Sequence, residues 1–311
     1  MPLVAAYFIS GEAALLNLGL IAVSLLIPTL KLRLTPQTIV LHYLAILLTF
    51  GALFLAAPIK PLFVTLTALA AFIAVALTRY GDALRTLGNW VFIPAVYLAC
   101  EVREGVSDAE AMRHAGLIVA ASPVALALVC GVRIFDLRRH LGAKPPHYGV
   151  VSVRWFVPAA ATAAAVFAAA TLVEVLHLAQ GQWVIWSAAS VVVGDLSAST
   201  SKLKQRAVGA LVGVPLGLML GIRLPESRAG YSLAVLAATL TLMAFTRYPL
   251  GFGLRCFFIA LAAAFAGTAS GIAEERVANV ITGGAFGVIA VTLSEALWRS
   301  FAPKASGTPQ Q

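Results

Sequence analysis

Charged side chains are scarce in this sequence. Asp, Glu, Lys and Arg make up 11% of the 311 residues, whereas hydrophobic residues make up 60%. An ordinary soluble domain carries about 25% charged residues and is about half apolar. A chain this apolar has too few polar side chains to cover a surface in water, but a bilayer accepts apolar side chains on the outside of helices. The composition therefore argues against a soluble protein and predicts an integral membrane protein.

Cysteine and histidine are also scarce, and their spacing indicates neither a disulfide framework nor a metal site. Cys100, Cys130 and Cys256 lie in apolar segments without a CxxC spacing. The five histidines do not cluster at ligand spacing, and the motifs GxSxG, HExxH and GxxxxGK[ST] are absent from the sequence. We therefore expect no catalytic residues, no metal and no cofactor, and we expect that the protein is not an enzyme.

Apolar stretches of membrane-spanning length recur along almost the whole chain. A transmembrane helix needs about 17 to 25 predominantly apolar residues, and polar residues, Pro or Gly separate about eleven such stretches. The sequence therefore predicts an all-α, polytopic integral membrane protein of about eleven transmembrane helices. The predicted spans are 9–29, 39–57, 61–78, 86–102, 114–133, 157–178, 182–199, 205–222, 231–246, 250–270 and 277–297.

The positions of Lys and Arg predict how the helices are oriented. If 135–154 is a basic cytoplasmic loop, most of the 22 Lys and Arg residues fall on the cytoplasmic side, in agreement with the positive-inside rule. The net charge of +9 is then a signal of topology, so no nucleic acid is expected as a partner. The pattern predicts a multi-pass protein with its C-terminus in the cytoplasm.

A diverged internal repeat is visible in the chain. The window that starts at Lys60 aligns without a gap with the window that starts at Gly181, which matches Arg85 with Arg206, Gly88 with Gly209 and Pro94 with Pro215. Both copies cross the membrane in the same direction, an arrangement found in transporters whose path lies between two halves. The predicted division is an N-terminal transmembrane helix (1–30), a first transmembrane repeat (31–134), a basic cytoplasmic loop (135–154), a second repeat (155–300) and a disordered tail (301–311).

The second copy has a distinctive order of segments. A Trp-initiated apolar helix is followed by a basic turn and by an Arg-x-x-Gly start to a glycine-rich helix, at positions Trp183, Arg206, Gly209 and Gly213. This order resembles the fusaric acid resistance and aromatic acid exporter (FUSC-like) family. The stretch from Tyr248 through Arg276 to Gly287 resembles the closing pair of helices of that family.

The resemblance implies a bacterial inner-membrane transporter, with proton-driven efflux of aromatic or amphipathic organic acids. A related plant group conducts organic anions, so an organic-anion channel is one alternative. A non-transporting membrane subunit of a larger assembly is another. The expected partners are the lipid bilayer and a small organic-anion substrate, with a homo-oligomer or a periplasmic adaptor protein as further candidates.

An organic anion that crosses a medium of low dielectric constant needs positive partners. Arg85 and Arg206 are predicted at the cytoplasmic entrances of matched helices, and Arg255 is predicted about two turns into the tenth span. We interpret these three as the substrate-binding residues of an anion-attracting vestibule, with Arg255 the deepest. Topology anchoring is the alternative for Arg85 and Arg206, and snorkelling to the interface is the alternative for Arg255.

Proton coupling would need a group that titrates inside the bundle. Asp195 in the seventh predicted span is the first candidate, although an Asp at this position also suits a helix cap or a pair with a following lysine. Glu174 and His177 form a second candidate because residues at i and i+3 share a helix face. Both of these residues are predicted near the outer end of their helix, where water reaches them.

Glycine and proline positions concern packing more than chemistry. Gly209, Gly213, Gly217 and Gly221 recur every four residues and predict a ridge without side chains, against which another helix packs closely. Proline is predicted in mid-helix at Pro94 and Pro215, where it removes a backbone hydrogen bond and favours a kink.

Overall fold

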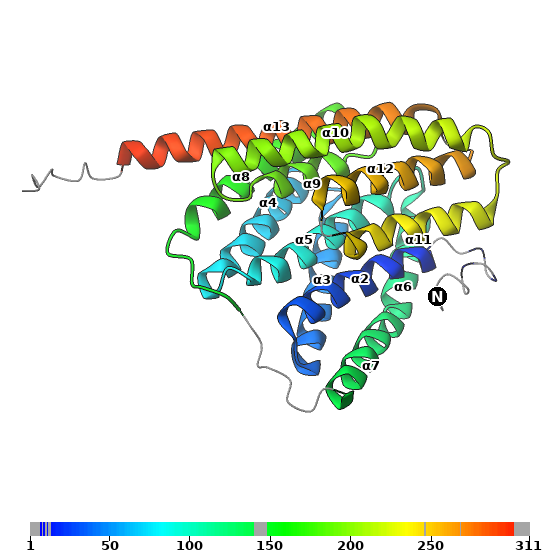
Figure 1. Ribbon diagram of the computed structural model, residues 1–311, viewed down its shortest axis with the longest axis horizontal. Helices are drawn as coiled ribbons and strands as arrows, with labels where there is room; N and C mark the ends of the chain where they lie inside the picture. The colour runs from blue at the N-terminus through cyan, green and yellow to red at the C-terminus, as the bar shows by residue number, and fades with distance from the viewer. Residues whose placement is uncertain are drawn as a thin grey trace, which may run out of the picture.

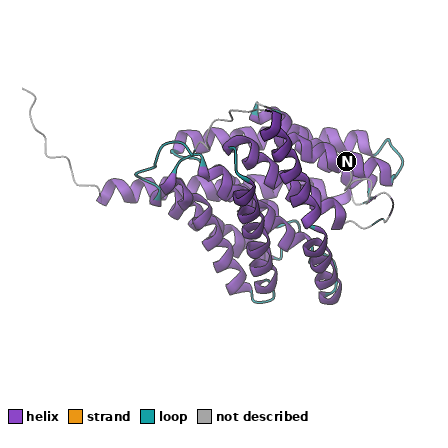
Figure 2. Ribbon diagram, turned by 90° about the horizontal axis from the view of Figure 1, so that it is seen from below, coloured by secondary structure: helices purple, strands orange, loops and turns teal. Residues whose placement is uncertain are grey.

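The protein is helical throughout the part that the structure describes. The computed structural model describes residues 7, 9, 11, 14–139, 148–245, 247–267 and 269–301, and these contain helices and loops but no strand (Figures 1 and 2). The predicted all-α fold is therefore confirmed. The predicted disordered tail, 301–311, lies outside the described residues apart from Phe301, and the predicted basic loop lies partly outside them.

Several helices are long enough to cross a bilayer. Within the described residues, eight helical stretches have the length and hydropathy of membrane spans, which confirms a polytopic membrane protein. The helices are α2 (Ala14–Leu32), α3 (Pro36–Ala56), α4 (Lys60–Ala76), η1 (Leu77–Tyr80), α5 (Leu84–Glu101), α6 (Asp108–Ala121), α7 (Pro123–Arg139), α8 (Phe156–Leu176), α9 (Gln182–Val191), α10 (Leu196–Gly221), α11 (Arg228–Ala244), α12 (Tyr248–Phe265) and α13 (Ala269–Phe301).

Two of the predicted spans are not single helices. The span predicted at 114–133 is divided between α6 and α7, because Pro123 has no N–H with which to continue the hydrogen-bond ladder. The span predicted at 182–199 ends early, since α9 stops at Val191 and α10 begins at Leu196. This break lets α10 begin at Leu196, earlier in the chain than the predicted start at 205, and it determines the position of the candidate site.

Helix α9 lies in the interior of the bundle, packed against α13, α8 and α5 (Figure 1). Most of its side chains are buried, including both tryptophans, Trp183 and Trp186. Helices α10, α12 and α13 run along one side of the molecule in Figure 1, and α2, α3, α6 and α7 lie towards the other. A helix that is buried on all faces is typical of the core of a multi-helix membrane protein.

The glycine ridge of α10 packs against α12. A Cβ atom at Gly213 would overlap the carbonyl oxygen of Gly253, and one at Gly217 would overlap the carbonyl oxygen of Phe257. The two helices run in the same direction, and each glycine lets the backbone of α12 approach more closely than any side chain allows. The predicted role of the ridge in close helix packing is confirmed.

Replacement of Gly213 by Ala should destabilise the protein, because the added methyl group would force α10 and α12 apart. Overpacking of this kind costs about 1 to 3 kcal/mol. The matched control is Gly51→Ala in α3, where no atom lies within 4 Å of the added Cβ. Thermal unfolding in detergent should show a lower Tm for Gly213→Ala and an unchanged or higher Tm for Gly51→Ala, since Ala favours helix. Equal melting temperatures for the two variants would contradict the packing argument.

Candidate functional site

Two arginines approach one aromatic ring across the interface between α10 and α12. The guanidinium carbon of Arg206 lies 4.4 Å from the centroid of the Phe252 ring, and that of Arg255 lies 6.0 Å from the same centroid. Arg206 donates from Nη1 to the Tyr248 hydroxyl at 3.0 Å, and Arg255 donates from Nε to the Thr241 hydroxyl at 3.1 Å. Arg206 and Arg255, two of the three residues predicted to bind substrate, therefore lie close to the same ring.

Arg206 is buried well inside α10. Its side chain is only 2% exposed, and its Nε has no hydrogen-bond partner within the described residues. The sequence predicted Arg206 at the entrance of a helix that starts near residue 205, whereas α10 starts at Leu196. The break after α9 thus explains why this residue lies deeper than expected, while Arg255 is only partly buried.

Further basic side chains continue this group towards the start of α10. The ammonium nitrogen of Lys202 lies 5.3 Å from the centroid of the Tyr248 ring and close enough to Arg85 and Arg206 to interact with both charges. Arg85, from α5, donates from Nη2 to the carbonyl oxygen of Val192 at the end of α9. Arg85 is thus near Lys202 and separated from Arg255 along the length of α10.

Arg276 is a fifth member that the sequence did not reveal. The last predicted span starts at residue 277 and leaves Arg276 just outside it, but α13 already begins at Ala269 and carries Arg276 into the interior. Its guanidinium carbon lies 3.7 Å from the centroid of the Trp183 ring. An arginine shortly before the glycine-rich part of an apolar helix was the only signal. We define the basic cluster as Arg85, Lys202, Arg206, Arg255 and Arg276.

Nearby carboxylates do not balance the positive charge of the basic cluster. None of its members forms an ion pair with a carboxylate in the part of the chain that the structure describes, where the ion pairs include Arg103–Asp108, Arg133–Asp136 and Arg299–Glu295. Aromatic rings and hydroxyl groups supply most of the contacts instead, and ring faces attract cations. The cluster can therefore accept an anion.

The break between α9 and α10 has hydrogen-bond partners from three other elements. The N–H of Leu196 donates to Glu295 Oε1 at 2.9 Å, and the N–H of Val193 donates to the Ser199 hydroxyl at 3.5 Å. Arg85 binds the last carbonyl, as described above. Backbone groups of an interrupted helix at membrane depth need such partners, because lipid supplies none.

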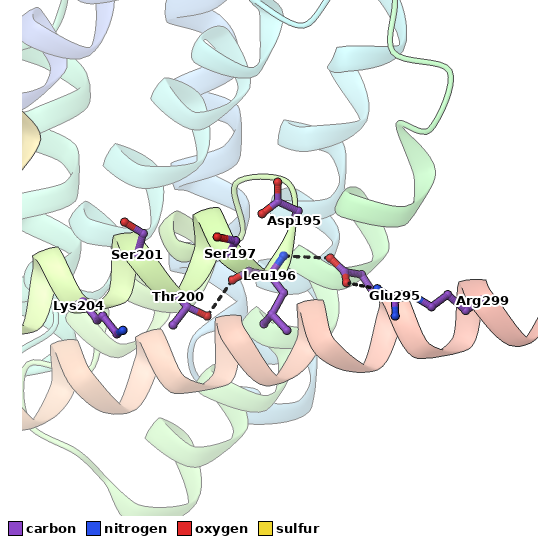
Figure 3. A pocket seen from close by; sticks show the side chains of 8 residues that line it. All are labelled: Asp195, Leu196, Ser197, Thr200, Ser201, Lys204, Glu295 and Arg299. Carbon is purple, nitrogen blue, oxygen red and sulfur yellow. Dashed lines mark hydrogen bonds and ion pairs between the residues drawn. The ribbon is translucent and has the colours of Figure 1, made fainter.

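Asp195 caps α10 at this break. Its carboxylate accepts a hydrogen bond from the N–H of Ala198 at 2.7 Å, and its side chain is exposed. It borders a pocket of about 630 Å³ between the start of α10 and the late part of α13 (Figure 3). The pocket is lined by Asp195, Leu196, Ser197, Thr200, Ser201, Lys204, Glu295 and Arg299.

Glu174 and His177 lie at the opposite end of α9. Lys60 Nζ donates to the carbonyl oxygen of Glu174 at 3.1 Å and lies 3.3 Å from Nε2 of His177. His177 is exposed and ends α8 in a left-handed conformation, with φ 50°. Glu174 borders a second pocket of about 260 Å³, which is also lined by Gln180, Gly181 and Gln182.

The structure therefore separates the proton-coupling candidates. Asn279 of α13 donates to the carbonyl oxygens of Ala179 and Gln180, whereas Glu295 of the same helix accepts from Leu196. These two contacts are about 24 Å apart along α13 at the rise of an α-helix. Asp195 is at one end of the bundle, and the pair Glu174 and His177 is at the other.

Comparison with known proteins points to one family. Residues 148–290 match the family model described as fusaric acid resistance protein-like, which confirms the predicted resemblance over this stretch. The matched stretch includes α8 to α12, most of α13 and every member of the basic cluster except Arg85. No curated protein and no solved structure matches the chain.

Replacement of Glu295 by Ala should loosen the start of α10, because the Leu196 N–H would lose its acceptor. A hydrogen bond to a charged group contributes about 1.5 to 3 kcal/mol, so we expect exchange of the Leu196 amide hydrogen to accelerate about tenfold or more. The control is Arg299→Ala, which removes only the partner of the other carboxylate oxygen at 3.5 Å. Hydrogen exchange that is equally fast in both variants would show that Glu295 does not hold the break.

Proposed function

We propose that this chain, whose residues 148–290 match the fusaric acid resistance protein-like family, carries small organic anions across a membrane through the basic cluster. The observation that carries the proposal is the pair Arg206 and Arg255. Both guanidinium groups approach the Phe252 ring, and neither has a carboxylate partner among the described ion pairs. The family match supports a transport role independently.

The free-energy cost of a buried charge also supports the transport of anions. A charged side chain inside a membrane protein is expensive unless it is paired or wetted, so intramembrane arginines are usually retained for function. Arg206 is 2% exposed, and its contacts among the described residues are with a neutral hydroxyl and one aromatic ring. A mobile anion that neutralises Arg206 and Arg255 in turn would recover part of this cost at each step of its passage.

The aromatic surroundings favour an aromatic or amphipathic carboxylate as the substrate. Tyr248 and Phe252 stack with a centroid distance of 6.0 Å beside Arg206, and Trp183 and Trp186 stack with a distance of 5.1 Å beside Arg276. A ligand with a ring and a carboxylate would use both the rings and the cations of the site. This matches the substrate class that the family resemblance implies.

The proposed energy source for efflux is the proton gradient, and Asp195 is the proposed coupling residue. Its exposed carboxylate borders the larger pocket together with Glu295 and Lys204, so water and protons reach it. Glu174 and His177 remain the second candidate, at the opposite end of the path. The proposed location is a bacterial inner membrane, with the Asp195 end of the bundle in the cytoplasm.

Uptake of labelled hydroxybenzoate into proteoliposomes, with and without a proton gradient, tests the proposal. Saturable flux should follow the gradient, and Arg206→Gln or Arg255→Gln should reduce it about tenfold or more, since a hydrogen bond to a charged group is worth about 1.5 to 3 kcal/mol. Asp195→Asn should abolish the effect of the gradient. The matched control is Arg247→Gln, which removes an exposed charge directly before α12.

The other outcomes of this experiment are equally informative. Flux that follows voltage but ignores the pH gradient would identify an anion channel. Absence of flux with the correctly folded protein would favour a non-transporting subunit, and full activity of both arginine variants would remove the basic cluster from the pathway.

Cysteine labelling should establish the orientation. In a cysteine-free background, Ser197→Cys places a thiol in the larger pocket and Ala179→Cys places one in the smaller pocket, and both positions are exposed. A membrane-impermeant maleimide should label Ser197→Cys only from the cytoplasmic side and Ala179→Cys only from the outside. The reverse pattern would invert the proposed topology, and labelling of both from one side would contradict a two-ended path.

A further inference from the structure

Arg276 is the largest of the fully buried side chains in the described part of the chain, with 1% of its side chain exposed. Its Nε, Nη1 and Nη2 are all buried without a hydrogen-bond partner among the described residues. A guanidinium group has five N–H donors and no acceptor. Apart from the weakly accepting Cys256 thiol, the described residues therefore offer this donor set no acceptor, although the ring of Trp183 covers one of its faces.

The neighbours of Arg276 do not balance its charge. The Cys256 thiol lies beside the guanidinium group and is itself fully buried, but a neutral thiol is only a weak acceptor. The carboxylate of Glu101 accepts instead from Gln182 Nε2, at 3.4 Å, and it forms no ion pair with Arg276 among those of the described residues. A buried charge without a partner strongly destabilises a fold.

Other positive groups raise this cost further. Trp183 belongs to the first turn of α9, and the N-terminus of a helix carries a partial positive charge. Arg206 and Arg255 lie close enough to repel Arg276. The arrangement is thus incomplete without a negative group, and the described part of the chain does not provide one.

The smaller pocket borders the residues that precede Trp183. Gln180, Gly181 and Gln182 line the smaller pocket, and Trp183 follows them directly. Asn279 lies one turn after Arg276 on α13 and donates to the carbonyl oxygens of Ala179 and Gln180, so it fixes α13 against this turn. The smaller pocket therefore borders the turn that leads directly into Trp183, the residue on which Arg276 stacks.

We propose that Arg276, stacked on Trp183, is an anion-binding subsite that takes the carboxylate group of an organic acid entering or leaving through the smaller pocket. A planar guanidinium group offers parallel N–H donors that match the two oxygens of a carboxylate. The identity of the anion as the transported substrate rests on the proposed function. The binding itself does not depend on whether the protein transports.

Thermal unfolding of the purified protein in detergent tests the subsite. In sodium methanesulfonate buffer, benzoate should raise the wild-type Tm in a saturable manner, because a ligand that binds only the folded state stabilises it. Benzamide, which has the same shape without the charge, should have no effect. Arg276→Gln should lose most of the benzoate-dependent rise, and without benzoate its Tm should equal or exceed that of the wild type, because the unbalanced charge is gone.

Two further variants keep the test decisive. Arg276→Lys retains the charge without the planar fork and should keep a smaller benzoate-dependent rise. Arg223→Gln removes an exposed charge from the loop after α10 and should respond to benzoate as the wild type does. If Arg276→Gln unfolds on purification, the comparison of Arg276→Lys with Arg223→Gln decides the question.

Several results would overturn the inference. One is a benzoate-dependent rise in Tm that is undiminished in Arg276→Gln, and another is a wild-type Tm that benzoate never raises. An equal rise in Tm with chloride in place of benzoate would assign the subsite to inorganic anions. A lower Tm of Arg276→Gln with an unchanged benzoate response would assign Arg276 a purely structural stacking role. Binding of benzoate without flux in proteoliposomes would contradict the proposed function alone. Flux together with an unchanged benzoate-dependent rise in the Tm of Arg276→Gln would contradict the subsite alone.

Discussion

The close approach of α10 to α12 is the contact on which the candidate site depends. Gly209 and Gly213 present no side chains to α12, so the backbone of Gly253 and the ring of Phe252 fit directly against α10. This contact brings the Phe252 ring close to an arginine of each helix. Helices in lipid gain little from burying apolar surface against each other, so such packing supplies much of their association.

The interruption between α9 and α10 is the second determinant of the site. A continuous helix would satisfy its own backbone, but at this interruption Val192, Val193 and Leu196 rely on side chains from α5, α10 and α13, respectively. The same interruption lets α10 start earlier and brings Arg206 into the interior. One local departure from regular structure therefore links three elements and sets the depth of a buried cation.

Hydropathy sufficed to predict the helical membrane architecture, because every predicted span overlaps a helix and long apolar stretches have no alternative in lipid. It did not predict the interruption, because Val191, Val192 and Val193 continue the apolar run and only Gly194 and Asp195 mark the break. Asp195 was recognisable as a helix cap, but its residue type also suits a proton carrier. Arg276 was missed because charge near a helix end is typical of a loop, and only tertiary packing shows that it is buried.

Helix α13 connects the two ends of the bundle. Through Asn279 it is hydrogen-bonded to the turn before α9, and through Glu295 to the start of α10, while Gly283 lies directly against the backbone of α9 between them. An α-helix resists stretching, so it transmits a tilt along its length as a rigid rod does. A tilt of α13 would therefore move Glu295, which lines the larger pocket, together with the turn at Ala179 and Gln180, which lines the smaller one.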